Sequence, residues 1–178
     1  MRIIGGIHKG KRIEVVKGLP VRPTTDFAKE ALFNILFNKI DFEGAEILDL
    51  FCGTGNIALE CASRGAHVTA IDMHFGCTKF VSETAKKLDL TVTTFKSDVF
   101  KFLATHHKAY DVVFADPPYD LENIADIHKY VFENNLLKKN GWLILEHGPK
   151  TKLEELLKFV EHRKYGNVNF SFFQASND

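Results

Sequence analysis

The sequence is poor in the residues that build disulfide-bonded, zinc-binding and membrane-spanning proteins. It holds three cysteines among 178 residues, Cys52, Cys61 and Cys77, and no two of them form a Cys-x-x-Cys pair. An odd, unpaired set argues against a disulfide framework and a zinc site, so we expect no metal and a reducing, cytoplasmic location. The apolar runs are no longer than a strand, and the first residues lack the apolar core of a signal peptide. We therefore expect no membrane segment.

The chain also lacks an excess of charge of either sign, but its charges are unevenly placed. Twenty-three basic and 23 acidic side chains balance overall. Residues 1–25 nevertheless carry six basic side chains and a single acidic one, Glu14. A basic arm on a mildly acidic body indicates a polyanionic partner that is met at the N-terminus. Charge alone equally allows a hairpin edge that its lysines keep soluble.

Proline is scarce too, yet two of the five prolines stand together in Asp116-Pro117-Pro118-Tyr119. This tetrapeptide directly follows the apolar run 112–115, and the Pro-Pro pair must end that strand because it has no backbone donor. The backbone carbonyls and the Asp116 carboxylate then point beyond the strand end, beside the flat ring of Tyr119. Such acceptors suit a planar group with an amino substituent, such as a nucleobase. We predict a catalytic site here; the alternative is a strand-ending turn with a buried tyrosine.

From residue 46 onward, strand-like and helix-like segments alternate. The expected strands are 47–51, 67–71, 91–95, 111–115 and 142–145, and the expected helices between them are 57–64, 76–88, 99–106 and 124–137. Repeated strand–helix units require a mostly parallel sheet with helices on both faces. After a further helix at 152–159, strands 161–165 and 169–174 flank Gly166-Asn167 and form an antiparallel hairpin. The sequence therefore predicts an α/β fold with a doubly wound, seven-stranded sheet.

The segment before this alternation forms an N-terminal unit of its own. Residues 2–16 have the pattern of a β-hairpin, with glycines between its two strands. Thr24, Thr25 and Asp26 offer N-caps for a helix through Asn38, whose apolar residues recur at helical spacing. We expect a single domain over residues 1–178, in which an N-terminal hairpin and helix (1–44) precede a catalytic core (45–178).

A glycine-rich turn at residues 52–56 follows the first strand of the core. Gly53 and Gly55 permit a tight turn that a ligand can approach, and a helix begins directly after it. Asp72 ends the second strand, where it can accept both ribose hydroxyls of an adenosine, and Asp98 ends the third, where it can hold the adenine amino group. These acceptors share the sheet edge at which such folds bind ligands. The predicted cofactor-binding residues are Asp49, Phe51, Gly53, Thr54, Gly55, Asp72, Met73, Asp98 and Val99.

The same turn, Gly53-x-Gly55-x-x-Ala58, also fits a dinucleotide-binding fingerprint, so a dehydrogenase is an alternative. Asp49 counts against it, because a carboxylate there adds negative charge near a pyrophosphate. It instead favours a ligand that carries an ammonium and a sulfonium. The acceptor side shows Asp116-Pro-Pro-Tyr rather than a histidine or lysine arranged for hydride transfer. S-adenosylmethionine is therefore the predicted cofactor.

Taken together, these motifs resemble those of a known group of enzymes. Asp49-Leu-Phe-Cys-Gly-Thr-Gly, Asp72, Asp98 and Asp116-Pro-Pro-Tyr are similar to the class I S-adenosylmethionine-dependent methyltransferases that act on amino nitrogens. Arg2-Ile-Ile-Gly-Gly, Arg22-Pro-Thr-Thr-Asp, Glu30-Ala-Leu-Phe-Asn-Ile-Leu, Arg163-Lys-Tyr-Gly and Ser171-Phe-Phe narrow the resemblance to the RsmD family of 16S ribosomal RNA guanine-N2 methyltransferases. The resemblance covers nearly the whole chain. The chain departs from the family at Phe27 and Lys29, where arginines are usual, and this departure affects RNA contacts rather than the chemistry.

The resemblance implies methyl transfer to the exocyclic N2 of a guanine in 16S rRNA, in an assembled or nearly assembled small ribosomal subunit, by a monomeric enzyme. Asp116 and the Pro117 carbonyl would orient the amine, so that most of the rate comes from positioning and electrostatic fit. The basic arm would bind RNA through Arg2, Lys9, Lys11, Arg12, Arg22 and Thr24. The same acceptor geometry suits an adenine-N6 or protein-amide methyltransferase. An alternative of another class is a non-catalytic RNA-binding or dinucleotide-binding protein on this fold.

Overall fold

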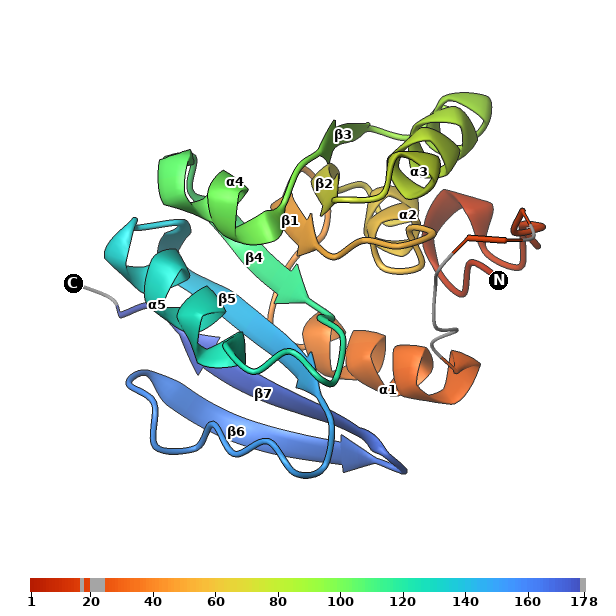
Figure 1. Cartoon of the computed structure of the whole chain (residues 1–178). Coiled ribbons are helices and arrows are strands. Elements are labelled where there is room, and N and C mark those ends of the chain that lie inside the picture. Colours follow the sequence, from red (N-terminus) through yellow and green to blue (C-terminus); the bar gives the residue numbers. More distant parts are fainter. Residues whose placement is uncertain (17, 20–24, 177–178) are drawn as a thin grey trace.

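A computed structural model describes residues 1–16, 18–19 and 25–176 and contains one seven-stranded sheet (Figure 1). The strand order is β3-β2-β1-β4-β5-β7-β6. The mutually parallel strands are β1 (Glu46–Leu50), β2 (His67–Asp72), β3 (Val92–Lys96), β4 (Tyr110–Ala115) and β5 (Leu137–His147). Strand β7 (Val168–Gln174) is antiparallel to both of its neighbours, β5 and β6 (Phe159–Tyr165). The predicted doubly wound α/β sheet with an antiparallel C-terminal hairpin is confirmed.

Helices cover both faces of this sheet. Helices α1 (Asp26–Phe37), α2 (Ala58–Ser63) and α3 (Phe75–Lys87) lie on one face, and α4 (Val99–Thr105) and α5 (Ile124–Glu133) lie on the other (Figure 1). Successive side chains of a central strand point to opposite faces of the sheet. Ile47 packs toward α1 and α2, whereas Leu48 packs toward α4 and α5. This alternation explains why the central strands are apolar throughout. Within the described residues, no helix is long and apolar enough to cross a membrane.

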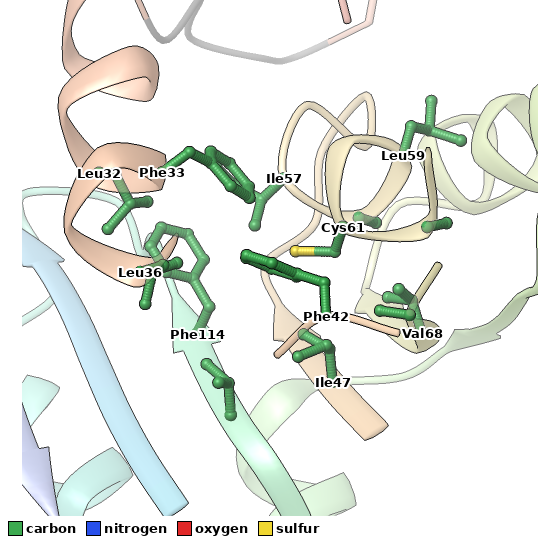
Figure 2. Close-up of a cluster of buried hydrophobic side chains, with 14 of the residues drawn as sticks. Leu32, Phe33, Leu36, Phe42, Ile47, Ile57, Leu59, Cys61, Val68 and Phe114 are labelled. Carbon is green, nitrogen blue, oxygen red and sulfur yellow. The ribbon is translucent and has the colours of Figure 1, made fainter. Parts of the chain in front are cut away.

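Helix α1 joins the N-terminal unit to the core. Thr25 caps it as predicted, because its side chain accepts a hydrogen bond from the Ala28 amide at 3.3 Å. Leu32, Phe33 and Leu36 form its buried face and pack toward Phe114 of β4 (Figure 2). The N-terminal unit is thereby held over the same sheet face as α2.

The N-terminal segment doubles back as predicted but does not form two extended strands. Arg2 and Arg12 pair in one isolated antiparallel bridge, and residues Gly6–His8 form a short 3₁₀ helix, η1. The reason is that this segment packs on α2. A Cβ at Gly6, whose φ is +72°, would lie 1.7 Å from the carbonyl oxygen of Ser63. The backbone of the N-terminal segment therefore forms some of its hydrogen bonds with side chains of α2 rather than with a second strand.

Two predictions in the C-terminal half were wrong: the helix at 152–159 and the end of helix α5. The helix expected at 152–159 does not exist: this segment is a series of turns, with amide-to-carbonyl bonds from Leu156 to Leu153 and from Phe159 to Leu156. Those turns suffice to bury Leu153, and partly Leu156, on the α4–α5 side. Helix α5 ends at Glu133 rather than at residue 137, because Asn135 adopts a left-handed conformation (φ 52°). The chain then enters β5 earlier than expected.

Candidate functional site

Three carboxylates lie at the carboxyl ends of three neighbouring strands. Asp49 belongs to β1, Asp72 ends β2, and Asp116 follows β4. Since the order of the sheet is β2-β1-β4 at this point, the connections leave β1 and β4 in opposite directions and open a crevice between them. Asp49 is 2% exposed. Burial, followed by the negative charges of Asp116 and Asp72, raises the pKa of Asp49 well above its usual range.

Two of these carboxylates also fix the glycine turn. Asp72 Oδ2 accepts a hydrogen bond from the Gly53 amide at 2.9 Å, and Asp49 Oδ2 accepts one from the Ala58 amide, at the start of α2, at 3.0 Å. Gly53 and Gly55 have positive φ values of 53° and 78°. Phe51, directly before the turn, also has a positive φ, of 61°, which is uncommon for a bulky residue and marks local backbone strain. The two hydrogen bonds to Asp72 and Asp49 hold the turn in shape.

The other predicted cofactor residues lie along the same edge. Asp72 Oδ1 accepts a hydrogen bond from the His74 amide at 2.8 Å, so each oxygen of Asp72 keeps acceptor capacity beyond one backbone bond. Asp98 caps α4 by accepting from the Lys101 amide at 2.9 Å. Met73 is 70% exposed, whereas Val99 is buried. The ribose and adenine roles of these residues stay predictions.

A small, closed space, the acceptor hollow, lies beside the predicted acceptor residues Pro117, Pro118 and Tyr119. The Tyr119 hydroxyl donates a hydrogen bond to Glu146 Oε1 at 3.1 Å, and Glu146 is itself 4% exposed. A Cβ at Gly148 would lie 3.1 Å from the Tyr119 ring, so a side chain there would press on the tyrosine. The residues that line the hollow are Pro117, Pro118, Tyr119, Leu121, Ile124, Glu146, His147, Gly148 and Thr151. Glu146, which was not among the predicted site residues, therefore lines the hollow and holds the Tyr119 hydroxyl.

A buried histidine holds the end of β5 at this hollow. His147 Nδ1 contacts the Gly148 carbonyl at 2.9 Å, and Nε2 contacts the Ser171 hydroxyl at 2.8 Å. Burial lowers the pKa of His147, so the neutral ring is favoured. A neutral ring that donates from Nδ1 accepts at Nε2, which matches both partners. His147 thus positions the strand end that carries Glu146.

The predicted RNA-binding residues do not all share one environment. Lys9, Lys11 and Arg12 are exposed and form no ion pair with any residue in the described ranges. Arg2 instead lies 3.4 Å from Asp26 and 3.3 Å from Glu30, so intramolecular ion pairs partly neutralise it. Arg22 and Thr24 lie outside the described residues.

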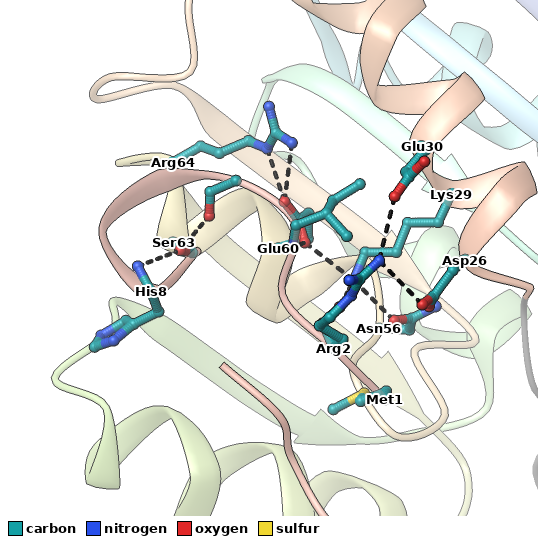
Figure 3. Close-up of polar contacts among 12 residues, drawn as sticks. Met1, Arg2, His8, Asp26, Lys29, Glu30, Asn56, Glu60, Ser63 and Arg64 are labelled. Carbon is teal, nitrogen blue, oxygen red and sulfur yellow. Dashed lines mark hydrogen bonds and ion pairs between the residues drawn. The ribbon is translucent and has the colours of Figure 1, made fainter. Parts of the chain in front are cut away.

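Sequence reasoning missed a buried cation that joins the arm to the cofactor turn (Figure 3). Lys29 is 1% exposed, and its Nζ lies 3.0 Å from Glu60 Oε2, 2.8 Å from the Arg2 carbonyl and 2.9 Å from Asn56 Oδ1. Burial lowers the pKa of Lys29, and the charge of Glu60 opposes that shift. The ammonium group thus contacts the arm, the residue after Gly55, and α2. Lys29 is a structural residue here and does not reach solvent.

The whole chain can now be compared with known proteins. Residues 1–174 match the family described as "Conserved hypothetical protein 95", the RsmD family. The chain belongs to this family. It is 32% identical over 183 residues to the "Putative rRNA methyltransferase YlbH" of Bacillus subtilis, with 98% of each chain covered. It is 34% identical over 145 residues to the "Ribosomal RNA small subunit methyltransferase D" of Escherichia coli K12, covering 80% of this chain and 69% of the relative.

A solved structure supports the same assignment. The "Putative methyltransferase yhhF from Escherichia coli" superposes with a TM-score of 0.86 at 26% identity, over 100% of this chain and 99% of the other. The RsmD-family assignment made from the motifs is confirmed, and so is S-adenosylmethionine as the cofactor. The preformed glycine turn and the three carboxylates fit a ligand that carries two positive charges and an adenosine.

The raised pKa of Asp49 predicts a pH-dependent cofactor affinity. The free folded protein keeps a proton on Asp49 that the unfolded chain loses near pH 4, so its stability falls as the pH rises above about 4. A cationic ligand favours the ionised carboxylate, and the affinity for S-adenosylmethionine therefore rises with pH over the same range. Calorimetry between about pH 5 and 8 measures this effect.

Two comparisons isolate the charge of Asp49. Asp49→Asn is expected to bind S-adenosylmethionine more weakly and with a flat pH profile. S-adenosylhomocysteine, which lacks the sulfonium charge, should show a smaller rise with pH on the unmodified protein. An equal rise for both ligands would assign the pH dependence to another group.

Proposed function

We propose that this RsmD-family protein methylates the exocyclic N2 of a guanine in 16S rRNA of the small ribosomal subunit, as a cytoplasmic monomer. S-adenosylmethionine-dependent methylation of ribosomal RNA is what the family and the named relatives support. The choice of guanine N2 rests on the acceptor hollow, where the buried Glu146 carboxylate accepts a hydrogen bond from Tyr119.

The hollow suits an amine that is a weak nucleophile. S-adenosylmethionine, when bound, supplies an electrophilic methyl group. The Asp116 carboxylate and the Pro117 carbonyl accept the two N–H groups of the amine and so direct its lone pair toward the cofactor crevice. Because a positioned acceptor sets the geometry, no strong base is required before transfer. The target base has to leave its stack to reach this point, and Tyr119 offers it a ring to lie against.

Glu146 is the observation that favours guanine over adenine. The Watson–Crick edge of guanine presents two neighbouring donors, N1–H and the N2 amine, whereas adenine presents one donor and one acceptor, N1. A buried carboxylate accepts hydrogen bonds when ionised, so it pairs with N1–H of guanine and opposes the lone pair of adenine N1. Glu146 lines the hollow and already accepts a bond from Tyr119, which fixes its orientation.

Base substitution tests the acceptor atom directly. Reconstituted small subunits that carry inosine in place of the target guanine lack only the N2 amine, and we expect no methylation of them. Adenine at the same position should not restore activity, because it leaves polar groups of the hollow unpaired. Mass spectrometry of the modified nucleotide gives the result. A methyl group on adenine N6 would overturn the acceptor assignment and leave the fold and cofactor intact.

The basic arm is expected to bind RNA through phosphates. Changing Lys9, Lys11 and Arg12 to alanine should weaken RNA binding and flatten its salt dependence by about 0.7–0.9 log units for each lost phosphate contact. The affinity for S-adenosylmethionine should stay the same. Binding titrations at several salt concentrations measure both effects.

A matched control removes the same charge from the opposite face of the sheet. Lys101 and Lys129 are exposed on α4 and α5, and Lys139 is exposed in β5. Their triple alanine variant should leave the salt dependence nearly unchanged. If both triple variants lower the salt dependence of RNA binding equally, the lysines and arginine of the arm only keep that edge soluble and do not form a specific RNA contact.

A further inference from the structure

An exposed aromatic pair lies where the arm helix meets the C-terminal hairpin. Phe27, in the first turn of α1, is 67% exposed, and its ring packs edge to face with Tyr165 at the end of β6, with 6.0 Å between centroids and 79° between planes. Exposure of so large an apolar side chain usually needs a reason.

The pair lies at the same edge of the sheet as the acceptor hollow. His147, which lines the hollow, pairs with Asn169 of β7, and Asn169 pairs with Lys164 of β6. Tyr165 is therefore two strands away from the hollow, at the level where β5 ends. Figure 1 shows the start of α1 and the β6–β7 turn on the side toward which β4 and β5 point.

A polar groove continues from the aromatic pair along α1 and β6. It is lined by Ala31, Asn34, Ile35, Asn38, Lys39, Glu161, Arg163 and Tyr165. The cations Lys39 and Arg163 both pair with Glu161, at 2.8 and 2.5 Å. The groove thus carries more positive than negative side chains, together with two amides that can donate and accept hydrogen bonds.

Neither Phe27 nor Lys29 offers a cation to solvent. Lys29 is buried with its ammonium group on three acceptors, and Phe27 has no charge. The first turn of α1 therefore presents an aromatic ring at this surface. Aromatic rings bind unpaired nucleotides by stacking, and RNA whose target base is extruded has unstacked neighbours.

We propose that Phe27 and Tyr165 form a stacking platform for an unpaired rRNA nucleotide next to the target base, with the adjoining strand lying in the α1–β6 groove. The proposal rests on the proposed function, since it takes the same RNA as the ligand. The cations of the groove and the exposed ring of Phe27 match the two parts of a single RNA strand, its phosphates and its bases.

Substitutions at position 27 test the platform. Phe27→Ala should raise the KM for 16S rRNA about fivefold or more, since one base–aromatic stack is lost, while kcat and cofactor affinity change little. Phe27→Leu keeps apolar surface against Tyr165 but has no ring and should bind RNA as poorly. Phe27→Arg should recover binding and steepen its salt dependence by about 0.7–0.9 log units.

The same helix offers a matched control. Phe37 ends α1, is 73% exposed, and lies at the opposite end of the helix from Phe27. Phe37→Ala should leave the KM unchanged, and thermal unfolding of all four variants verifies that each is folded.

Each outcome discriminates. Equal KM values for Phe27→Ala and Phe37→Ala, in a preparation whose unmodified protein methylates guanine, would overturn the platform and leave the proposed function standing. Absence of guanine methylation by the unmodified protein would overturn the proposed function instead. A defect with assembled subunits but unchanged binding of Phe27→Ala to naked 16S rRNA would place a protein on this surface and overturn the proposal as well.

Discussion

Replacing Asp116 with alanine is expected to lower turnover about a hundredfold or more, the scale for losing one positioned electrostatic group. Asp116 directly follows β4 and precedes Pro117, which lines the acceptor hollow, and the proposed mechanism assigns its carboxylate to accept from the target amine. Cofactor affinity should change only severalfold. Single-turnover methylation and calorimetry separate the two quantities.

Two further variants make this prediction specific. Asp116→Asn keeps an acceptor oxygen but loses the charge, so its turnover should lie between those of the unmodified protein and Asp116→Ala. Asp120 is an exposed carboxylate four residues further on, and Asp120→Ala should retain nearly full turnover. Near-normal turnover of Asp116→Ala would remove Asp116 from the catalytic site.

Replacing Lys29 with methionine is expected to destabilise the fold by about 3 kcal/mol or more, because it removes one of the two cations that pair with the fully buried Glu60 carboxylate. Glu60 is 0% exposed and pairs with both Lys29 and Arg64, at 3.0 and 2.9 Å. The change also removes the donor to the Arg2 carbonyl and to Asn56. For a chain of this size, such a loss lowers the melting temperature by about 6 °C or more.

Controls distinguish the buried charge from lost packing. Lys79, whose side chain is 58% exposed, pairs with Glu83 at 3.8 Å, and Lys79→Met should cost less than about 0.5 kcal/mol. Adding Glu60→Gln to Lys29→Met should recover part of the loss, because it removes the buried carboxylate that has lost one of its two cations. A Lys29→Met protein as stable as Lys79→Met would contradict the structural role of Lys29.

The sheet and the cofactor turn could be predicted because their signals are local. Alternating segments of strand and helix length fix the number and direction of the core strands, and Gly53 and Gly55 mark the turn between β1 and α2. The C-terminal hairpin was predicted for the same reason, since Gly166-Asn167 separates two short runs. Each of these features depends on residues that are neighbours in sequence.

The features that were missed depend on contacts between distant residues. The path of the arm is set by α2, more than 50 residues away. The segment at 152–159 buries Leu153 without the helix that its apolar spacing predicts, and it leaves Leu157 exposed. One signal for Lys29 was present. It lies four residues before Phe33 and seven before Leu36, on the apolar stripe of α1, and a charge on such a stripe needs a buried partner.

The backbone of the arm fixes its position on α2, and its basic side chains take no part in this contact. The Ile4 amide donates to Glu60 at 2.8 Å, the His8 amide donates to the Ser63 hydroxyl at 3.0 Å, and that hydroxyl donates to the Gly5 carbonyl at 2.7 Å. On the arm side, all three bonds use backbone groups, and Gly6 allows the close approach. The exposed side chains at 9, 11 and 12 take no part in them. Evolution can therefore exchange these side chains, and with them the preference for one RNA surface over another, while the scaffold that presents them stays the same.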